Sequence, residues 1–476
     1  MCKLLRIRFF FVFLLSMAFV RCASLQHGGA SAEGVQGVVV ASHPIAADIG
    51  LDILRSGGNA IDSAVATGLA LGVVDQFNSG IGGGGFIVVR MADGTVFTID
   101  GRETAPAGAT RDMYVRDDEY DPSLSRVGPL AVGVPGILAA YGKALELAGT
   151  RTLKELISPS IEVAENGFEL DDYYILRYGD ALEKLKEDTA SVQIYLRPDG
   201  SPLEQGDILK QPDLAGIYSR LATDGLDYFY RGDSAKRLAG YMDDNGGLIT
   251  FEDMAGYSAK VREPVTGTYR GHEIIGMAPP SSGGVHIIQI LNMLEASRIL
   301  AGKTGWDTDS VCHAAQFMRK AFEDRAEHLG DIDYYPVPVE LLTSKRYAES
   351  CVAEILGVNA SAARPSPTLP ALGHTTNICV IDQWGNVAAI NQTVNLTYGA
   401  KITLPGTGVI LNNEMDDFSA RPGVPNAFGL IGSEANSIAS GKRPLSSMSP
   451  TIVLKDGKPV LVLGGAGGPT IITAVL

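Results

Sequence analysis

Two threonines that begin a predicted strand directly after a breaker-rich segment are the residues best placed to do chemistry. Thr375 and Thr376 follow residues 361–374, which contain Pro365, Pro367, Pro370 and Gly373 and predict an exposed connector. A threonine hydroxyl is a weak nucleophile that needs a nearby base. Because β-branched residues also suit ordinary strands, the pair alone is weak evidence for catalysis.

A predicted hairpin gives Thr375 its neighbours. Strand patterns at 375–382 and 386–395 flank a turn near Trp384. A turn centred on Trp384 places Thr375 opposite Thr393, with Asn395 two residues further along the same face. Opposed side chains have Cβ atoms about 5 Å apart, which allows contact between hydroxyls. A shift of one residue would turn Thr393 to the other face, so the geometry depends on this turn.

The remaining periodicity predicts antiparallel sheets covered by helices. Helical patterns cover 44–56 and 60–74, with Gly57-Gly58 as a stop and Asn59 as the cap of the second helix. Helical patterns also dominate from about 130 to 356. Strand patterns lie at 85–90 and 95–100, around the turn Asp93-Gly94, and at 408–413, 451–455 and 459–465. Helices and hairpins grouped in this way do not indicate a βαβ alternation.

Composition excludes several functional classes. The 476 residues are 45% hydrophobic and 20% charged, as in globular proteins, and length alone suggests about three domains. A net charge of −15 argues against a nucleic-acid partner. The seven histidines show no metal-ligand spacing, so no metal site is expected. Beyond residue 24, Cys312, Cys351 and Cys379 are expected to be buried free thiols.

The N-terminus has the layout of a signal peptide over 1–23. Basic residues precede an apolar run from Phe9 to Val20, which is too short to span a bilayer. The protein is therefore expected to be secreted or periplasmic. Lipid attachment at Cys22 is the less favoured alternative.

Two short motifs are expected to carry no function. Residues 80–85 satisfy G-x-G-x-x-G but precede a strand instead of opening a helix, which argues against a dinucleotide site. Asn391 and Asn395 match the N-glycosylation pattern, but their strand context predicts burial.

Several long motifs in one order resemble the γ-glutamyltranspeptidase family, from about residue 35 to the last residue. They are GIGGGGF (80–86), DGRETAP (100–106), NGGLITFEDMAGY (245–257), PPSSGGVHIIQILN (279–292), TTNICVIDQWGNVAAINQTVNLTYG (375–399), NNEMDDFS (412–419), PLSSMSP (444–450) and GGAGGPT (464–470). The resemblance implies an α+β fold, the four-layer αββα sandwich of N-terminal-nucleophile hydrolases, without a cofactor.

The resemblance also implies self-cleavage between His374 and Thr375. The products would be a large subunit, 24–374, and a small subunit, 375–476, which form a heterodimer. The sequence stops at ITAVL (472–476), whereas the family's small subunit continues, so the small subunit is expected to be C-terminally truncated.

Catalytic roles follow from the same match. Thr375 would be the nucleophile, and its freed α-amino group, with an ordinary pKa near 8, the base. Thr393 and Asn395 would orient it. Gly467 and Gly468 would supply backbone amides that stabilise the oxyanion.

The implied substrates are glutathione and other γ-glutamyl compounds, with water, amino acids or dipeptides as acceptors. Arg102, Ser446 and Ser447 match residues that bind the substrate carboxylate, and Glu414 and Asp417 match the acidic pair that binds its ammonium. Asp416 has a weaker claim. Residues 422–436, with Phe428, resemble a lid loop.

Two rival functions stay open on the sequence. A related amidase, such as a cephalosporin or glutaryl acylase or a poly-γ-glutamate depolymerase, would share the nucleophile. A non-enzymatic secreted binding protein would use the same cleft without cleavage.

Overall fold

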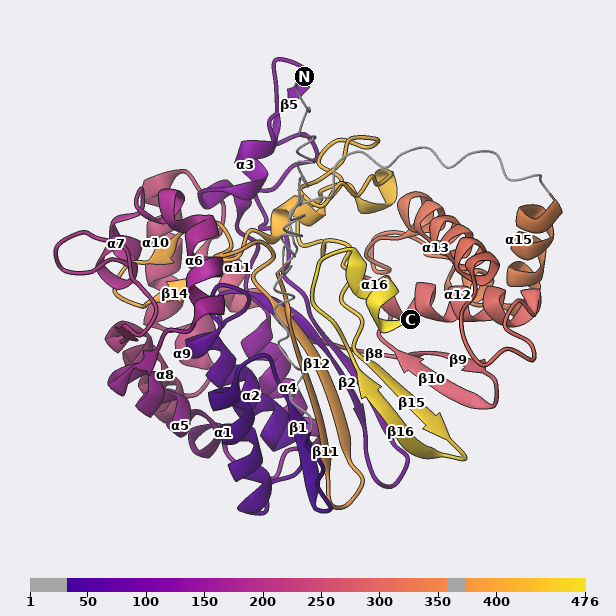
Figure 1. Cartoon of the computed structure of the whole chain (residues 1–476). Helices are drawn as coiled ribbons and strands as arrows, with labels where there is room; N and C mark the ends of the chain where they lie inside the picture. Colours follow the sequence, from indigo (N-terminus) through magenta and orange to yellow (C-terminus); the bar gives the residue numbers. More distant parts are fainter. Residues whose placement is uncertain (1–31, 358–373) are drawn as a thin grey trace, which may run out of the picture. The chain divides into compact units, whose positions relative to one another are not determined.

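Two antiparallel sheets form the centre of the computed structural model, which describes residues 32–357 and 374–476 (Figure 1). The first sheet has the order β1 (Gly37–Val40), β11 (Thr376–Asp382), β12 (Val387–Thr393), β2 (Gly84–Arg90), β3 (Val96–Gly101) and β8 (Lys260–Arg262). The second has the order β16 (Lys458–Leu463), β15 (Thr451–Lys455), β10 (His272–Gly276) and β9 (Val265–Tyr269).

Helices cover the outer face of each sheet (Figure 1). Against the first sheet pack α2 (Ala60–Val74) and α4 (Ile137–Ala148), supported by α1 (Pro44–Arg55), α5 (Leu153–Asn166) and α8 (Pro212–Asp224). Against the second pack α12 (Gly283–Ser297) and, beyond it, α13 (Thr308–His328) and α15 (Lys345–Gly357). Because β15 and β16 also contact β12, the described residues from Val35 onward form the predicted αββα sandwich.

Further helices and strands complete the described chain. The helices are α3 (Pro122–Arg126), α6 (Asp172–Leu185), α7 (Thr189–Tyr195), α9 (Asp227–Tyr230), α10 (Asp233–Asn245), α11 (Phe251–Gly256), α14 (Val339–Leu342) and α16 (Thr470–Val475), with short 3-10 helices at Pro129–Ala131, Glu414–Asp417 and Glu434–Asn436. The strands are β4 (Val115–Arg116), β5 (Glu119–Tyr120), β6 (Phe168–Glu169), β7 (Ile208–Leu209), β13 (Thr403–Leu404) and β14 (Val409–Ile410). No helix in the described ranges is long and apolar enough to cross a membrane.

Side-chain alternation on β12 divides the core in two. Ala388 and Ile390 pack with the helices around α2, whereas Val387 and Ala389 pack between the sheets with residues of α12 and β10. This is the period of two expected for a strand buried on both faces. Thr393 has the parity of Val387, so its side chain belongs to the inter-sheet side.

The structure confirms several predicted elements. Helix α2 covers the predicted 60–74, and Asn59 caps it in a capping box with Asp62. Strand β15 matches 451–455, and β2 pairs with β3 around Asp93-Gly94. Asn391 and Asn395 are buried as predicted.

Other expectations were wrong. Strands β8, β9 and β10 lie inside the region where helical patterns were expected to dominate, because strands of three to five residues give little periodic signal. Only Val409–Ile410 of the predicted strand 408–413 pairs. Cys312 is exposed, while Cys351 and Cys379 are buried. The signal peptide and Cys22 lie outside the described residues.

Both sheets combine strands from either side of the predicted cleavage position. Strand β11 pairs with β1, β12 pairs with β2, and β15 pairs with β10. The segments 24–374 and 375–476 therefore share two sheets and the core between them and do not form separate domains.

A chain cut between His374 and Thr375 should consequently stay assembled. The two fragments are expected to co-elute in size-exclusion chromatography at the mass of the whole chain and to separate only on a denaturing gel. Fragments that elute separately under native conditions would contradict the shared sheets.

Candidate active site

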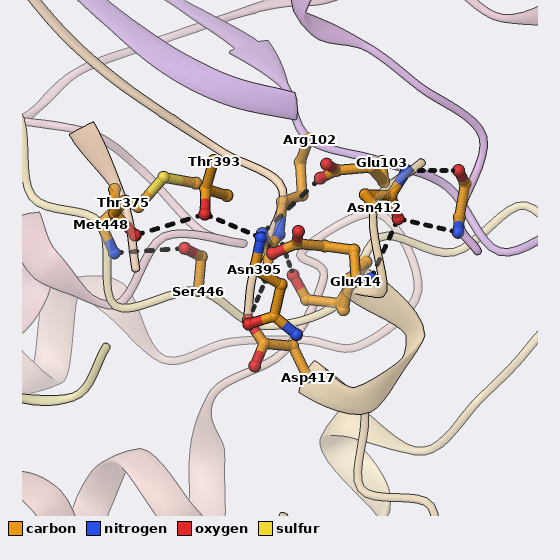
Figure 2. Close-up of polar contacts among 12 residues, drawn as sticks. Arg102, Glu103, Thr375, Thr393, Asn395, Asn412, Glu414, Asp417, Ser446 and Met448 are labelled. Carbon is orange, nitrogen blue, oxygen red and sulfur yellow. Dashed lines mark hydrogen bonds and ion pairs between the residues drawn. The ribbon is translucent and has the colours of Figure 1, made fainter. Parts of the chain in front are cut away.

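The hairpin of β11 and β12 sets the position of Thr375. Thr376 pairs with Gln392, so one further step along this ladder places Thr375 opposite Thr393. The two hydroxyl oxygens lie 3.3 Å apart (Figure 2). The register predicted from a turn at Trp384 is confirmed.

Both hydroxyls also contact the peptide bond that precedes Thr375. Thr375 Oγ1 lies 2.6 Å from the carbonyl oxygen of His374, and Thr393 Oγ1 donates to that oxygen at 2.9 Å. A donor on a carbonyl oxygen stabilises the negative charge that develops when a nucleophile attacks its carbon. The uncut chain therefore brings a nucleophile and an oxyanion donor to one peptide bond.

His374 differs from the exposed connector residue that was expected. It is buried, its ring contacts Arg177, and burial beside Arg177 and Lys401 lowers its pKa to about 3. The neutral ring thus sits beside cations without adding charge. The rest of the connector, 358–373, lies outside the described residues.

Asn395 supports Thr393 more directly than it supports Thr375. Its backbone N–H donates to Thr393 Oγ1 at 2.9 Å, and its Nδ2 donates to the carbonyl of Asn413 at 2.9 Å. The left-handed φ of 76° at Asn395 ends β12 and turns the chain toward Asn413. Asn395 lines the same pocket as Thr375.

Arg102 lies at the other side of the pocket among carboxylates (Figure 2). It is fully buried, pairs with Glu414 and with Asp417 Oδ2 at 2.5 Å, and lies 3.6 Å from Glu103. Burial is the main cause that raises the pKa of Glu103 and Glu414, and the adjacent carboxylates add to it. The arginine was expected to bind the carboxylate of the substrate's glutamyl end and the acidic pair its ammonium, yet here the arginine and the acidic pair bind one another.

Ser446 and Ser447 enter the pocket on a loop that docks beside the start of α12. Ser281 forms a parallel bridge with Ser446, and the backbone N–H and hydroxyl of Ser282 both donate to the carbonyl of Ser446. Ser446 Oγ accepts from the N–H of Met448 at 3.1 Å. Serines in PPSSGG (279–284) therefore hold the serines of PLSSMSP (444–450).

Gly468 lines the pocket, whereas Gly467 is not among the lining residues. Both have left-handed φ values, 57° at Gly468 and 129° at Gly467, just before α16. A Cβ on Gly468 would lie 2.9 Å from Phe428 Cδ1, so glycine allows the loop 422–436 to close over this segment.

One pocket brings together most of the predicted site residues. Thr375, Thr393, Asn395, Arg102, Glu414, Asp417, Ser446, Ser447, Gly468 and Phe428 line it, together with Arg325, Leu430, Met448, Pro469 and Ile471. Asp416 points elsewhere, toward Ser125 and the N–H of Ala427.

Sequence reasoning missed Arg325 and Glu103. Glu103 follows Arg102 in DGRETAP, so its place beside the pocket could have been inferred from that motif. Arg325 is a single arginine near the end of a helix, and nothing in its local sequence distinguishes it from a surface residue.

The fold is an αββα sandwich, and Thr375 stands at the start of an inner strand with its hydroxyl against the carbonyl that precedes it. This combination places the protein in the class of N-terminal-nucleophile hydrolases. The family model described as "Gamma-glutamyltranspeptidase" matches residues 46–476. The chain belongs to the γ-glutamyltranspeptidase family and is an enzyme of its hydrolase and transferase type.

Individual relatives agree with this assignment. The glutathione hydrolase proenzyme of Escherichia coli K12 is 44% identical over 451 residues, 93% of this chain and 77% of that protein. The Helicobacter pylori γ-glutamyltranspeptidase structure is 40% identical, with a TM-score of 0.66 over 68% of this chain and 93% of that one. A cephalosporin acylase structure from Bacillus halodurans, 26% identical, has a TM-score of 0.80 over 94% of this chain and 81% of that one.

Substitution of Gly468 tests the close approach of its backbone. Gly468→Ala should lower kcat by about 10-fold or more. An oxyanion donor contributes a rate enhancement of roughly 100- to 1,000-fold, and a displaced donor loses much of it. Gly457→Ala is the matched control, since Gly457 has a similar φ of 73° but no neighbour near its would-be Cβ. Equal kcat values for the two variants would contradict the role of Gly468.

Proposed function

We propose that Thr375 cuts the chain between His374 and itself and then carries a γ-glutamyl group to water or to an amine acceptor. The observation that carries the proposal is the pair of hydroxyl contacts to one carbonyl, 2.6 Å from Thr375 and 2.9 Å from Thr393. In the cleavage step, Thr375 Oγ1 attacks the carbonyl carbon of His374, and the C–N bond breaks as an ester forms. Water then hydrolyses the ester, which leaves a carboxylate on His374 and a free amine on Thr375.

The freed amine supplies the base that a threonine needs. A terminal α-amino group has an ordinary pKa near 8, so a substantial fraction is neutral close to physiological pH. The neutral amine takes the proton of the Thr375 hydroxyl as Oγ1 attacks the γ-carbonyl of the donor, and the leaving amine takes that proton. Water or an acceptor amine then attacks the ester on Thr375.

The charges of the pocket favour a zwitterionic head group. Glu414 and Asp417 provide negative charge for an ammonium, while Arg102 and the hydroxyls of Ser446 and Ser447 provide partners for a carboxylate. For Arg102 to bind a carboxylate, it must exchange part of its pairing with the acidic residues. A substrate that brings both charges replaces both halves of that pairing at once.

The related acylases suggest a second candidate. A glutaryl donor carries the carboxylate but lacks the ammonium, so it would leave Glu414 and Asp417 without a new partner. Buried carboxylates without partners are costly. The acidic pair therefore favours γ-glutamyl compounds such as glutathione over glutaryl or cephalosporin side chains.

The proposal includes the state and location of the enzyme. The active form is a heterodimer of its own fragments, 24–374 and 375–476, and it accepts amino acids or dipeptides. The signal-like sequence over 1–23 supports a secreted or periplasmic location.

Replacement of the nucleophile tests both steps. Thr375→Ala should remain one band on a denaturing gel and show no γ-glutamyl transfer, because the attacking oxygen is gone. Thr375→Ser keeps that oxygen and should still be cut. A wild-type chain that is active while uncut, or a cut Thr375→Ala chain, would contradict the mechanism.

Ammonium binding should depend on pH through Glu414. Burial raises the pKa of Glu414 above that of an ordinary glutamate, so its charge is present above this raised pKa and is lost as pH falls through it. The KM for a γ-glutamyl anilide should therefore rise as pH falls, at a higher pH than an ordinary carboxylate would produce. Glu414→Gln, with no titrating group at 414, should shift or remove this change in the KM profile.

A further inference from the structure

A second buried arginine, Arg325, reaches the pocket from the last turn of α13. Its Nε donates to Ser282 Oγ at 3.0 Å, and its Nη2 donates to Ser447 Oγ at 3.1 Å. The residue is 5% exposed. Among the described residues, no carboxylate lies within ion-pair distance of its guanidinium.

The two arginines of the pocket differ in how their charge is compensated. Arg102 has Glu414, Asp417 and Glu103 around it. In the described part of the chain, Arg325 has only serine hydroxyls as hydrogen-bond partners. Burial lowers its pKa to about 10, and the nearby carboxylate of Asp417 offsets this only in part. A buried cation without a direct ion pair is unfavourable, and a bound anion relieves that cost.

The contacts of Arg325 lead directly to the residues expected at the substrate carboxylate. Ser447 Oγ accepts from Arg325, so its own proton is free to point into the pocket. Ser282 Oγ, the second partner of Arg325, donates to the carbonyl of Ser446 at 2.7 Å. One guanidinium therefore holds the loop of both serines and adds a positive charge that has no direct ion-pair partner within the residues that the structure describes.

We propose that Arg325 is the second cation of the carboxylate subsite: it orients Ser447 and gives the α-carboxylate of the donor the positive charge that Arg102 shares with its acidic neighbours. This inference rests on the proposed γ-glutamyl transfer. It makes Arg325 a specificity-determining residue for donors that carry an α-carboxylate.

Two anilide donors that differ only in that carboxylate provide the test. The kcat/KM of γ-glutamyl-p-nitroanilide is divided by that of 4-aminobutyryl-p-nitroanilide, which keeps the ammonium and lacks the carboxylate. In Arg325→Gln this ratio should fall about 10- to 100-fold, which corresponds to the free energy of a hydrogen bond to a charged group. The loss should appear mainly as a higher KM for the γ-glutamyl donor. The 4-aminobutyryl donor should lose little.

Three controls separate this role from simple damage to the fold. Arg319→Gln removes the same charge from an exposed position of α13 and should leave the ratio unchanged. Arg325→Lys keeps the charge but cannot bridge both serines, so its ratio should fall by about 2- to 10-fold. A denaturing gel shows which variants are cut. If Arg325→Gln is not cut, the donor ratio of Arg325→Lys alone tests the role of Arg325.

A wild-type ratio in the cut Arg325 variants, or equal loss for both donors, would overturn the inference while leaving γ-glutamyl transfer intact. If the wild-type enzyme cleaves neither donor, the proposed function itself fails.

Discussion

The antiparallel pairing of β11 with β12 is the constraint on which the site depends. It places Thr375 opposite Thr393 and brings both hydroxyls to the carbonyl of His374. The same register sends Val387 and Ala389 into the core between the sheets. Because a slip of one residue would turn every side chain of the strand to its other face, core packing and nucleophile geometry are fixed together.

Charge compensation organises the remainder of the pocket. The carboxylates of Glu414 and Asp417 pair with Arg102, which limits the cost of burying all three. A zwitterionic donor offers each of these groups a replacement partner. A donor that carries only the carboxylate or only the ammonium leaves either the acidic residues or Arg102 without a replacement partner. The pocket can therefore discriminate between donors by charge without any change in its shape.

The fold also explains how one chain can be cut between His374 and Thr375 without losing its site. Residues on both sides of position 374 contribute neighbouring strands to each sheet, and the pocket combines Arg102 and Arg325 from the first segment with Thr375, Glu414 and Ser447 from the second. Buried strand pairing and a shared core hold these residues together. Chemistry at the peptide bond before Thr375 therefore need not separate them.

The sequence by itself determined the hairpin register and the capped helix at 60–74, because these follow from local periodicity and turn chemistry. Its contiguous motifs carried the family resemblance, and with it most of the residues of the pocket. It missed β8, β9 and β10, whose few residues gain their stability from neighbouring strands more than from local preference. Only the tertiary structure paired Arg102 with the acidic residues, buried His374 beside Arg177 and brought Arg325 to Ser447. These contacts join residues more than 100 positions apart in the chain, and electrostatic pairing at such separations is decided by packing, which no local pattern encodes.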